Sequence, residues 1–397
     1  MTSSSRTIAW LVWAIASVFY AYQYILRVMP SIMLPDIMAQ FHMDAALFGQ
    51  FVGIYYIGYS LLMLPIGILL DRYGPKKIMP LCILLTTLGL MPLLLADHWA
   101  FPIIGRLLIG IGSSAAILGA FKIIRLSFQE QHFTRMLSLA VTIGLIGAIY
   151  GGGPVNYLRD TLGYEAVVGL MAGAGVILSI LTYCIVPNMP AYRVPSIWHE
   201  LKLVLTNRQV LLICFFAGLM VGPLEGFADV WGTVFLKKVY GFDSTMAATL
   251  PSAIFVGMCF GAPLLSLIAE KSRRYFWTIT LAGLLMTMGF VSLLTGKVGL
   301  EGMSALFVAI GVCSAYQILA IYKASTYVPE HAVGLTTATT NMIIMIFGYL
   351  FHSLIGWIVY ILGDAREALI GGIAVIPMAL AIGTSGFLYL SFKNKHS

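Results

Sequence analysis

Charged residues are scarce in this sequence. Only 10% of its 397 residues are Asp, Glu, Lys or Arg, whereas 60% are hydrophobic, and the mean hydropathy is +0.93. Soluble globular domains carry about 25% charged residues, so this composition excludes that class. Because lipid offers the backbone no hydrogen-bond partner, the chain must cross a membrane as helices or as a closed barrel. Apolar runs of about 20 residues favour helices over short alternating strands.

Motifs of catalysis and cofactor binding are also lacking. The chain has no Gly-Lys-Ser/Thr phosphate-binding loop, no cluster of metal ligands and no nucleophile with a base at a known spacing. We therefore expect no enzymatic activity, no cofactor and no bound metal. The five cysteines fall within apolar runs without paired spacing, which favours packing over disulfides. The first apolar run is too long for a cleavable signal peptide, so we expect it to remain as a span.

Charges, prolines and turn residues divide the chain into twelve apolar segments. They are predicted at 8–34, 47–70, 78–96, 101–126, 136–158, 164–187, 210–236, 246–269, 275–296, 302–327, 333–361 and 368–392. The longest polar connection, 188–209, separates an N-terminal bundle over 1–187 from a C-terminal bundle over 210–397. The predicted fold class is an all-α membrane protein, with twelve transmembrane helices in two pseudo-symmetric six-helix bundles.

Lysine and arginine are distributed unevenly over the predicted connections. Of the 23 Lys and Arg residues, 14 fall on one side of the predicted membrane and 5 on the other, and the rest lie within spans. Positive residues are retained on the cytoplasmic side, which predicts cytoplasmic termini and a cytoplasmic central connection. We expect a multi-pass protein of the cell membrane, such as a bacterial inner membrane. The formal charge of +7 then follows from topology and requires no nucleic-acid partner.

The fourth and tenth segments resemble each other. ILGAFK over 117–122 matches ILAIYK over 318–323 at an offset of 201 residues, which predicts two parallel repeats. Both end in a lysine, and a lysine inside a membrane helix is costly unless it faces protein, water or a counter-ion. We interpret Lys122 and Lys323 as cations of a central cavity that bind substrate. The alternative is that each reaches the cytoplasmic headgroups.

A glycine, an aspartate and a basic cluster end the second apolar run as GILLDRYGPKK over 67–77. This segment closely resembles the signature loop between the second and third helices of the major facilitator superfamily. The resemblance implies a secondary transporter in which the glycine permits tight helix packing and the aspartate and arginine latch a cytoplasmic gate. We therefore assign gating to Gly67, Asp71, Arg72 and Lys76, with Glu130 as a partner for Arg72. A solvated loop that only enforces topology is the alternative.

Two further segments resemble motifs of the same superfamily. RLLIGIGSSAA over 106–116 is similar to its fourth-helix pattern of an arginine followed by small residues. The resemblance implies that Arg106 biases the proton affinity of a nearby acid, whereas the alternative is an anchor at the periplasmic interface. GLIGAIYGGGP over 144–154 partly resembles the glycine-proline motif of drug and proton antiporters, although close packing and a bend also explain it.

A polar stripe on the first span is the candidate substrate site. It consists of Tyr20, Gln23, Tyr24, Arg27 and Ser31, which recur at three- and four-residue steps. A guanidinium can hold a carboxylate or phosphate with two parallel hydrogen bonds, so Arg27 is its functional centre. Its setting resembles that of organophosphate and organic-anion transporters of the superfamily. Aromatic side chains predicted toward the same cavity include Tyr55, Tyr56 and Tyr59 on the second span and Tyr316 on the tenth.

Two acids lie one turn apart on the seventh span. Glu225 and Asp229 suit either a proton site or recognition of a substrate ammonium group, because burial and mutual repulsion favour the protonated form of at least one. Alternatively, Arg27 pairs with one of them as a structural or gating ion pair.

These patterns together predict a proton-coupled, alternating-access importer of a small carboxylate-bearing solute, such as an amino acid, short peptide or polycarboxylate. Its expected partners are the solute, protons and the lipid bilayer, and we expect a monomer. Two alternatives are a proton-driven exporter of drugs or secreted metabolites and a solute receptor with a transporter fold.

Overall fold

The structure is a computed structural model that describes residues 3–129, 132–188, 198–329, 332–363 and 365–393. Contacts divide the chain into two compact units, one of residues 1–43 and 54–195 and the other of residues 44–53 and 196–397. We call them unit 1 and unit 2. The first residues of helix α3 therefore belong by contact to unit 2, and the rest of that helix belongs to unit 1.

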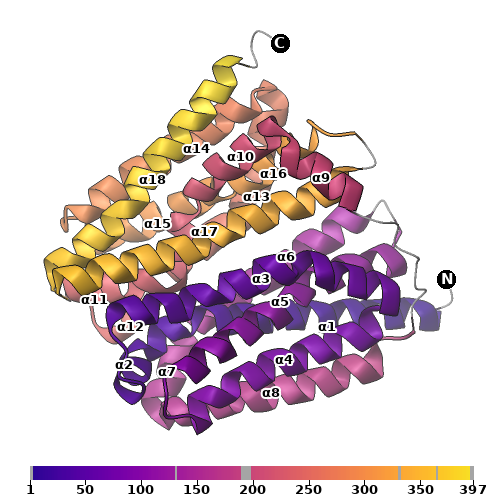
Figure 1. Ribbon diagram of the computed structural model, residues 1–397, viewed down its shortest axis with the longest axis horizontal. Coiled ribbons are helices and arrows are strands. Elements are labelled where there is room, and N and C mark those ends of the chain that lie inside the picture. The colour runs from indigo at the N-terminus through magenta and orange to yellow at the C-terminus, as the bar shows by residue number, and fades with distance from the viewer. Residues whose placement is uncertain (1–2, 130–131, 189–197, 330–331, 364, 394–397) are drawn as a thin grey trace. The chain divides into compact units, whose positions relative to one another are not determined.

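Unit 1 is built from the N-terminal helices (Figure 1). They are α1 (Ser3–Val28), α2 (Pro30–Gln40), α3 (Ala45–Tyr73), α4 (Pro75–Leu95), α5 (Ala100–Ser127), α6 (Phe133–Gly151), α7 (Gly153–Leu162) and α8 (Tyr164–Ile185). Helix α4 packs between α5 and α8, and α1 packs against α5 and α6. Every regular element described in this unit is helical, as the composition predicts.

Unit 2 holds the remaining helices. They are α9 (Trp198–Thr206), α10 (Arg208–Leu219), the π-helical segment η2 (Gly222–Trp231), α11 (Gly232–Tyr240), α12 (Ser244–Thr249), α13 (Ser252–Ser272), α14 (Tyr275–Leu294), α15 (Leu300–Ser314), α16 (Tyr316–Ser325), α17 (Val333–Leu362) and α18 (Arg366–Lys393). Helix α18 packs against α14 and α17, and α13 packs against α15.

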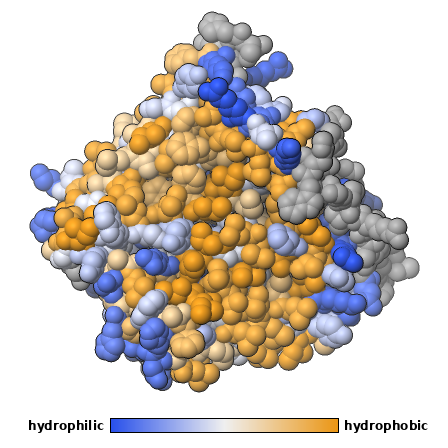
Figure 2. Space-filling model, in the orientation of Figure 1, coloured by the Kyte–Doolittle hydropathy of each residue, from blue (hydrophilic) through white to orange (hydrophobic). Residues whose placement is uncertain are grey.

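The predicted all-α membrane fold is confirmed. Within the described ranges, eleven helical segments are long and apolar enough to span a membrane, and the bent pair α6–α7 makes a twelfth. On the face shown in Figure 2, apolar residues cover the middle of the helices and hydrophilic residues gather near helix ends. Leucines and isoleucines such as Leu81, Leu88, Ile177 and Ile180 are exposed on the surface of the helices. Lipid tails can solvate such side chains, whereas water cannot.

Several spans are broken where the sequence places proline or glycine. Helix α1 ends at Val28 and α2 begins at Pro30, because proline lacks the N–H that an uninterrupted helix would donate to the carbonyl of Leu26. In the fifth span the chain bends by 40° at Gly152, before Pro154. These breaks change the direction of the helix within the predicted membrane region, so each leaves backbone groups that the fold must satisfy.

Glycines allow the closest helix contacts of unit 1. A methyl group on Gly110 of α5 would overlap the carbonyl oxygen of Tyr55 on α3, and one on Gly112 would lie 2.7 Å from the methyl carbon of Thr86. Small residues permit such approach between membrane helices. We expected the same role for Gly67, but a Cβ there would meet only Leu118, at 3.8 Å. The structure does not show the close approach that we expected at this glycine.

Gly110 and Gly67 make a matched pair for a test of helix packing in unit 1. We predict that Gly110→Ala lowers stability by about 1–3 kcal/mol, because the methyl group forces backbone apart. Gly67→Ala is expected to be neutral or slightly stabilising, since alanine is the better helix former and has room. Thermal unfolding of both purified variants in detergent measures the difference. Equal losses in the two variants would contradict the packing argument.

Candidate functional site

Arg27 lies in the last turn of α1 and is buried in unit 1. Its side chain is 5% exposed, and its guanidinium carbon lies 5.0 Å from the ring centroid of Tyr24 and 5.2 Å from that of Tyr56. Ring faces attract a cation through their quadrupole, and more strongly where water is excluded. The arginine is thus held by aromatic groups of α1 and α3. These ring contacts stabilise its charge.

The predicted polar stripe comes together around this arginine. Tyr20 and Tyr24 pack edge to face at 5.2 Å. The hydroxyl of Tyr55 donates a hydrogen bond to Oε1 of Gln23 at 2.7 Å, and the ring of Tyr55 stacks on that of Tyr59 at 5.9 Å. Unit 1 therefore gathers the predicted residues of the first and second spans into one buried cluster of phenols, an amide and a guanidinium.

Arg106 of α5 supports the broken end of α1. Its Nη1 donates to the carbonyl oxygen of Leu26, and its Nη2 donates to that of Arg27 at 2.7 Å. The carbonyl of Leu26 is the one that Pro30 leaves without its helical donor. Arg106 is 2% exposed, which contradicts the alternative that it anchors at the membrane interface. Its guanidinium also lies 4.9 Å from the ring centroid of Tyr55.

An ion pair joins one of the predicted gate residues to one of the predicted substrate-binding residues. The ammonium of Lys122, which we predicted to bind substrate, donates to Oδ1 of Asp71, which we predicted to act in the gate. The side chains are 12% and 47% exposed. Lys122 is therefore paired with the gate segment in this structure, and its role in substrate binding stays a prediction.

The other predicted gate residues make different contacts. Arg72 is exposed and lies over the ring of its neighbour Tyr73, and Nζ of Lys76 lies 5.2 Å from the ring centroid of Tyr183. Glu130, the predicted partner of Arg72, lies outside the described residues. The Arg72 pairing stays a prediction.

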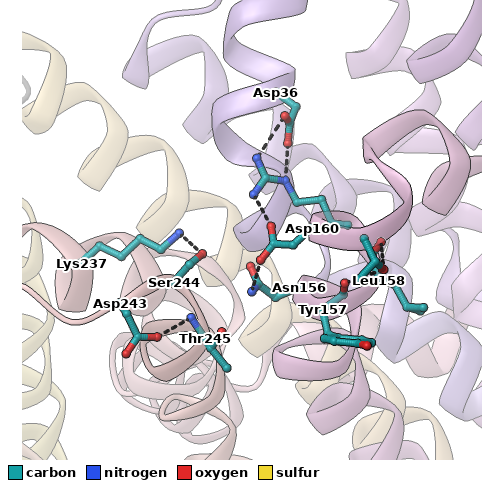
Figure 3. A network of polar contacts seen from close by, with 11 residues as sticks. Asp36, Asn156, Tyr157, Leu158, Asp160, Lys237, Asp243, Ser244 and Thr245 are labelled. Atoms are coloured by element: carbon teal, nitrogen blue, oxygen red, sulfur yellow. Dashed lines mark hydrogen bonds and ion pairs between the residues drawn. The ribbon is translucent and has the colours of Figure 1, made fainter.

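A second ion-pair network in unit 1 was not predicted. Arg159 of α7 binds Asp36 of α2 with two hydrogen bonds, from Nε at 2.7 Å and from Nη2 at 3.1 Å (Figure 3). Its Nη1 also contacts Asp160, which in turn accepts a hydrogen bond from Asn156. Both α2 and α7 follow a helix break, so this network ties together the two half-helices beyond the breaks. Residues 123 positions apart give no signal of such pairing in sequence spacing.

Polar contacts of unit 2 appear in the same view (Figure 3). Nζ of Lys237 donates to Oγ of Ser244 at 2.8 Å, and Asp243 accepts from the backbone N–H of Thr245 at 2.9 Å. A side-chain oxygen at this position satisfies donors that the first turn of α12 leaves free. These contacts fix the connection between α11 and α12.

Glu225 and Asp229 lie on the π-helical segment η2 of unit 2. All ten residues of η2 are buried, and each of the two acids is 1% exposed. The segment packs on α17, where Cβ atoms on Gly222 and Gly226 would meet the side chain of Phe351 at about 3 Å. π-Helical turns are rare and occur frequently at functional sites. Periodicity placed both acids on one helix face but did not predict the altered helix type.

Tyr316 and Lys323 occupy the two ends of α16. The hydroxyl of Tyr316 donates to the carbonyl of Ala217 at 2.6 Å, so this phenol joins α16 to α10. Lys323 lies among three aromatic rings near the end of the helix. Among the described side chains, no three His, Cys, Asp or Glu residues lie close enough to hold a metal ion.

The family model of the Major Facilitator Superfamily matches residues 14–351 of this sequence. The chain belongs to the major facilitator superfamily. It is 24% identical over 346 residues to the uncharacterized transporter YybO of Bacillus subtilis, with 75% of this chain and 77% of the relative covered. An uncharacterized transporter of Rickettsia felis is 22% identical over 390 residues, covering 91% and 92%. The MFS-type transporter TOXA of Cochliobolus carbonum is 26% identical over 266 residues, covering 58% and 47%.

Solved structures of this superfamily share the fold. A bacterial homologue of the human lysosomal transporter Spinster, inward-facing and unoccupied, superposes with a TM-score of 0.78 at 16% identity and covers 98% of each chain. Its occupied form gives a TM-score of 0.74, also at 16% identity, with 96% of each chain covered. The predicted family is therefore confirmed, and this member of the major facilitator superfamily is a transporter.

The support that Arg106 gives to the break can be tested by restoring the missing donor. We predict that Arg106→Ala destabilises this superfamily member by about 1–3 kcal/mol for each carbonyl that it leaves unpaired. Adding Pro30→Ala returns an N–H that can reach the carbonyl of Leu26, so the double variant should regain part of the loss. Thermal unfolding in detergent measures both, with the exposed Arg125→Ala as the control. A double variant no more stable than Arg106→Ala would contradict this role.

Proposed function

We propose that this transporter imports a small carboxylate-bearing organic solute, such as an amino acid, short peptide or polycarboxylate, together with protons. The observation that carries the proposal is the buried guanidinium of Arg27 within a cluster of phenols. A cation inside a membrane helix is costly and marks a substrate or ion pathway by default. Its planar fork matches a carboxylate, and the hydroxyls around it can hydrogen-bond further polar groups of a solute.

Tyr20, Gln23, Tyr24 and Tyr59 form the rest of this proposed anion site. The three tyrosine rings exclude water, which strengthens the attraction between a guanidinium and a carboxylate. The hydrogen bond from Tyr55 fixes the amide of Gln23, and Arg106 fixes the backbone of Arg27. These contacts support a preorganised site, in which less conformational freedom is lost on binding.

The acids of η2 are the proposed proton site. Glu225 and Asp229 are both buried and lie four residues apart, where two negative charges repel each other strongly. A proton that binds or leaves there changes the charge of unit 2, which gives a physical basis for coupling to the conformational change.

A proton-driven exporter is the second candidate. It is favoured by the glycine-rich break between α6 and α7, where Gly152 separates the two helices and Pro154 follows. Counterflow in proteoliposomes of known orientation, with and without a pH gradient, distinguishes import from export.

We further propose that the chain acts as a monomer in a bacterial inner membrane, with both termini in the cytoplasm.

Replacing Arg27 tests the anion site. We predict that Arg27→Ala raises the concentration needed for half-maximal uptake by about 10- to 100-fold, because a charge-assisted hydrogen-bond pair is lost. Arg27→Lys should recover only part of the affinity, since an ammonium cannot bind both carboxylate oxygens in the same plane. Uptake and ligand-induced thermal stabilisation by amino acids, peptides and polycarboxylates are the measurements, with exposed Arg135→Ala as the control. Unchanged affinity in Arg27→Ala would rule out this site.

Neutralising the acids tests proton coupling. Glu225→Gln and Asp229→Asn imitate protonated carboxyls, so we predict that solute exchange continues while accumulation driven by a pH gradient is lost. Initial rates measured across a series of external pH values should lose their pH dependence in at least one variant. Exposed Glu301→Gln is the control. The proton site is wrong if both variants keep the wild-type pH profile.

A further inference from the structure

The two repeat-related lysines have different surroundings. Lys122 lies five residues before the last residue of α5, and Lys323 lies two residues before the last residue of α16. The matching segments 117–122 and 318–323 place both at equivalent positions of the two repeats. The sequence alone therefore predicts the same role for both lysines, whereas the structure gives them different neighbours.

In unit 1, the charge of Lys122 is balanced by a carboxylate. Its ammonium pairs with Asp71 at the end of α3, and only 12% of the lysine side chain is exposed. An anion that approaches Lys122 must compete with a carboxylate already in place. This lysine joins α5 to the end of α3.

In unit 2, the equivalent lysine is surrounded by aromatic rings. Nζ of Lys323 lies 5.5 Å from the ring centroid of Phe276, 5.5 Å from that of Tyr327 and 5.9 Å from that of Tyr275. Within the described ranges no carboxylate lies within ion-pairing distance of it. Glu270, which precedes the basic cluster of the corresponding connection, is exposed to solvent. Among the described residues, Lys323 therefore has no counterpart of the contact between Lys122 and Asp71.

Aromatic contacts have a different electrostatic consequence from an ion pair. A ring face stabilises a cation by about 0.5–1 kcal/mol at partly exposed sites, but it carries no net charge. The ammonium of Lys323 therefore keeps its full positive charge and its three donors while its position is held by three rings. A half-buried cation of this kind attracts an anion more strongly than a solvated one, because less water screens it.

We propose that the two lysines have divided their tasks: Lys122 is a structural cation of the signature-loop gate, and Lys323 binds one carboxylate group of the transported solute at the end of α16. This inference rests on the proposed function only in that the solute carries a carboxylate. The rings of Phe276, Tyr275 and Tyr327 hold the ammonium in place, which lowers the ordering cost when the anion binds.

An anionic lipid headgroup offers the same chemistry to a lysine near a membrane surface. Observing the two lysines directly shows which of them binds an anion, and whether that anion is a soluble carboxylate or a lipid headgroup. Purified protein with ¹³C-dimethylated lysines gives separate signals for Lys122 and Lys323, assigned by their loss in Lys122→Gln and Lys323→Gln. Methylation keeps the positive charge of each amine. The probes are citrate, glutamate and the dipeptide alanyl-glutamate, titrated in neutral detergent.

We expect a saturable shift of the Lys323 signal and none of the Lys122 signal. Lys323→Gln should weaken carboxylate binding by about 5- to 30-fold, as loss of one charge-assisted hydrogen bond predicts. Lys323→Arg should restore it, because arginine keeps both the charge and the ring contacts. Exposed Lys271→Gln serves as the matched control for charge. An unmoved Lys323 signal, or an equal response of both lysines, overturns the proposal.

The lipid arm repeats the titration in nanodiscs of phosphatidylcholine with and without phosphatidylglycerol. A Lys323 signal that responds to phosphatidylglycerol and to none of the soluble carboxylates identifies a headgroup anchor and overturns the proposal. Failure of this inference also differs from failure of the proposed function. Carboxylates that stabilise the protein through Arg27 while Lys323 stays silent leave the proposed function intact, whereas the absence of any carboxylate binding contradicts both.

Discussion

The fold of unit 1 depends on how the protein satisfies a backbone carbonyl inside the membrane. Pro30 removes the donor of the Leu26 carbonyl, and lipid cannot replace it. Arg106 supplies two donors from another helix and so joins α5 to the end of α1. Because the second carbonyl belongs to Arg27, the same interaction positions the backbone of the central residue of the proposed anion site. The contact that compensates for the helix break thus also positions the backbone from which the Arg27 side chain extends.

Cations of this transporter are stabilised in three different ways. Lys323 lies among aromatic rings, Lys122 and Arg159 pair with carboxylates, and Arg106 binds backbone oxygens. An ion pair neutralises a charge, whereas rings leave its field intact for another anion. The surroundings of a cation therefore separate residues suited to hold helices together from residues suited to bind a solute. The acids of η2 add protonatable groups on an altered helix type, at which backbone geometry departs from the regular pattern.

Much of the fold and part of the site could be predicted from single residues and their spacing. The apolar runs predicted the helices, and Tyr20, Gln23, Tyr24 and Arg27 were placed on one face because helical periodicity is local. The sequence predicts a cavity position for Lys122 because its repeat partner suggests a symmetric pair, but no sequence signal indicates its contact with Asp71. Gly67 was expected at a close helix contact, yet the close contacts lie at glycines such as Gly110.

The sequence by itself determined the membrane class, the helical fold and the superfamily, because hydropathy, periodicity and the signature loop depend on short stretches of chain. Only the tertiary structure decided which partner each charge has. Asp71 and Lys122 are 51 residues apart, and Asp36 and Arg159 are 123 apart. Such pairs form only when helices pack, and a few ångströms of displacement between helices changes the partner. The π-helical form of η2, whose glycines lie against the side chain of Phe351 on α17, likewise became visible only in the tertiary structure.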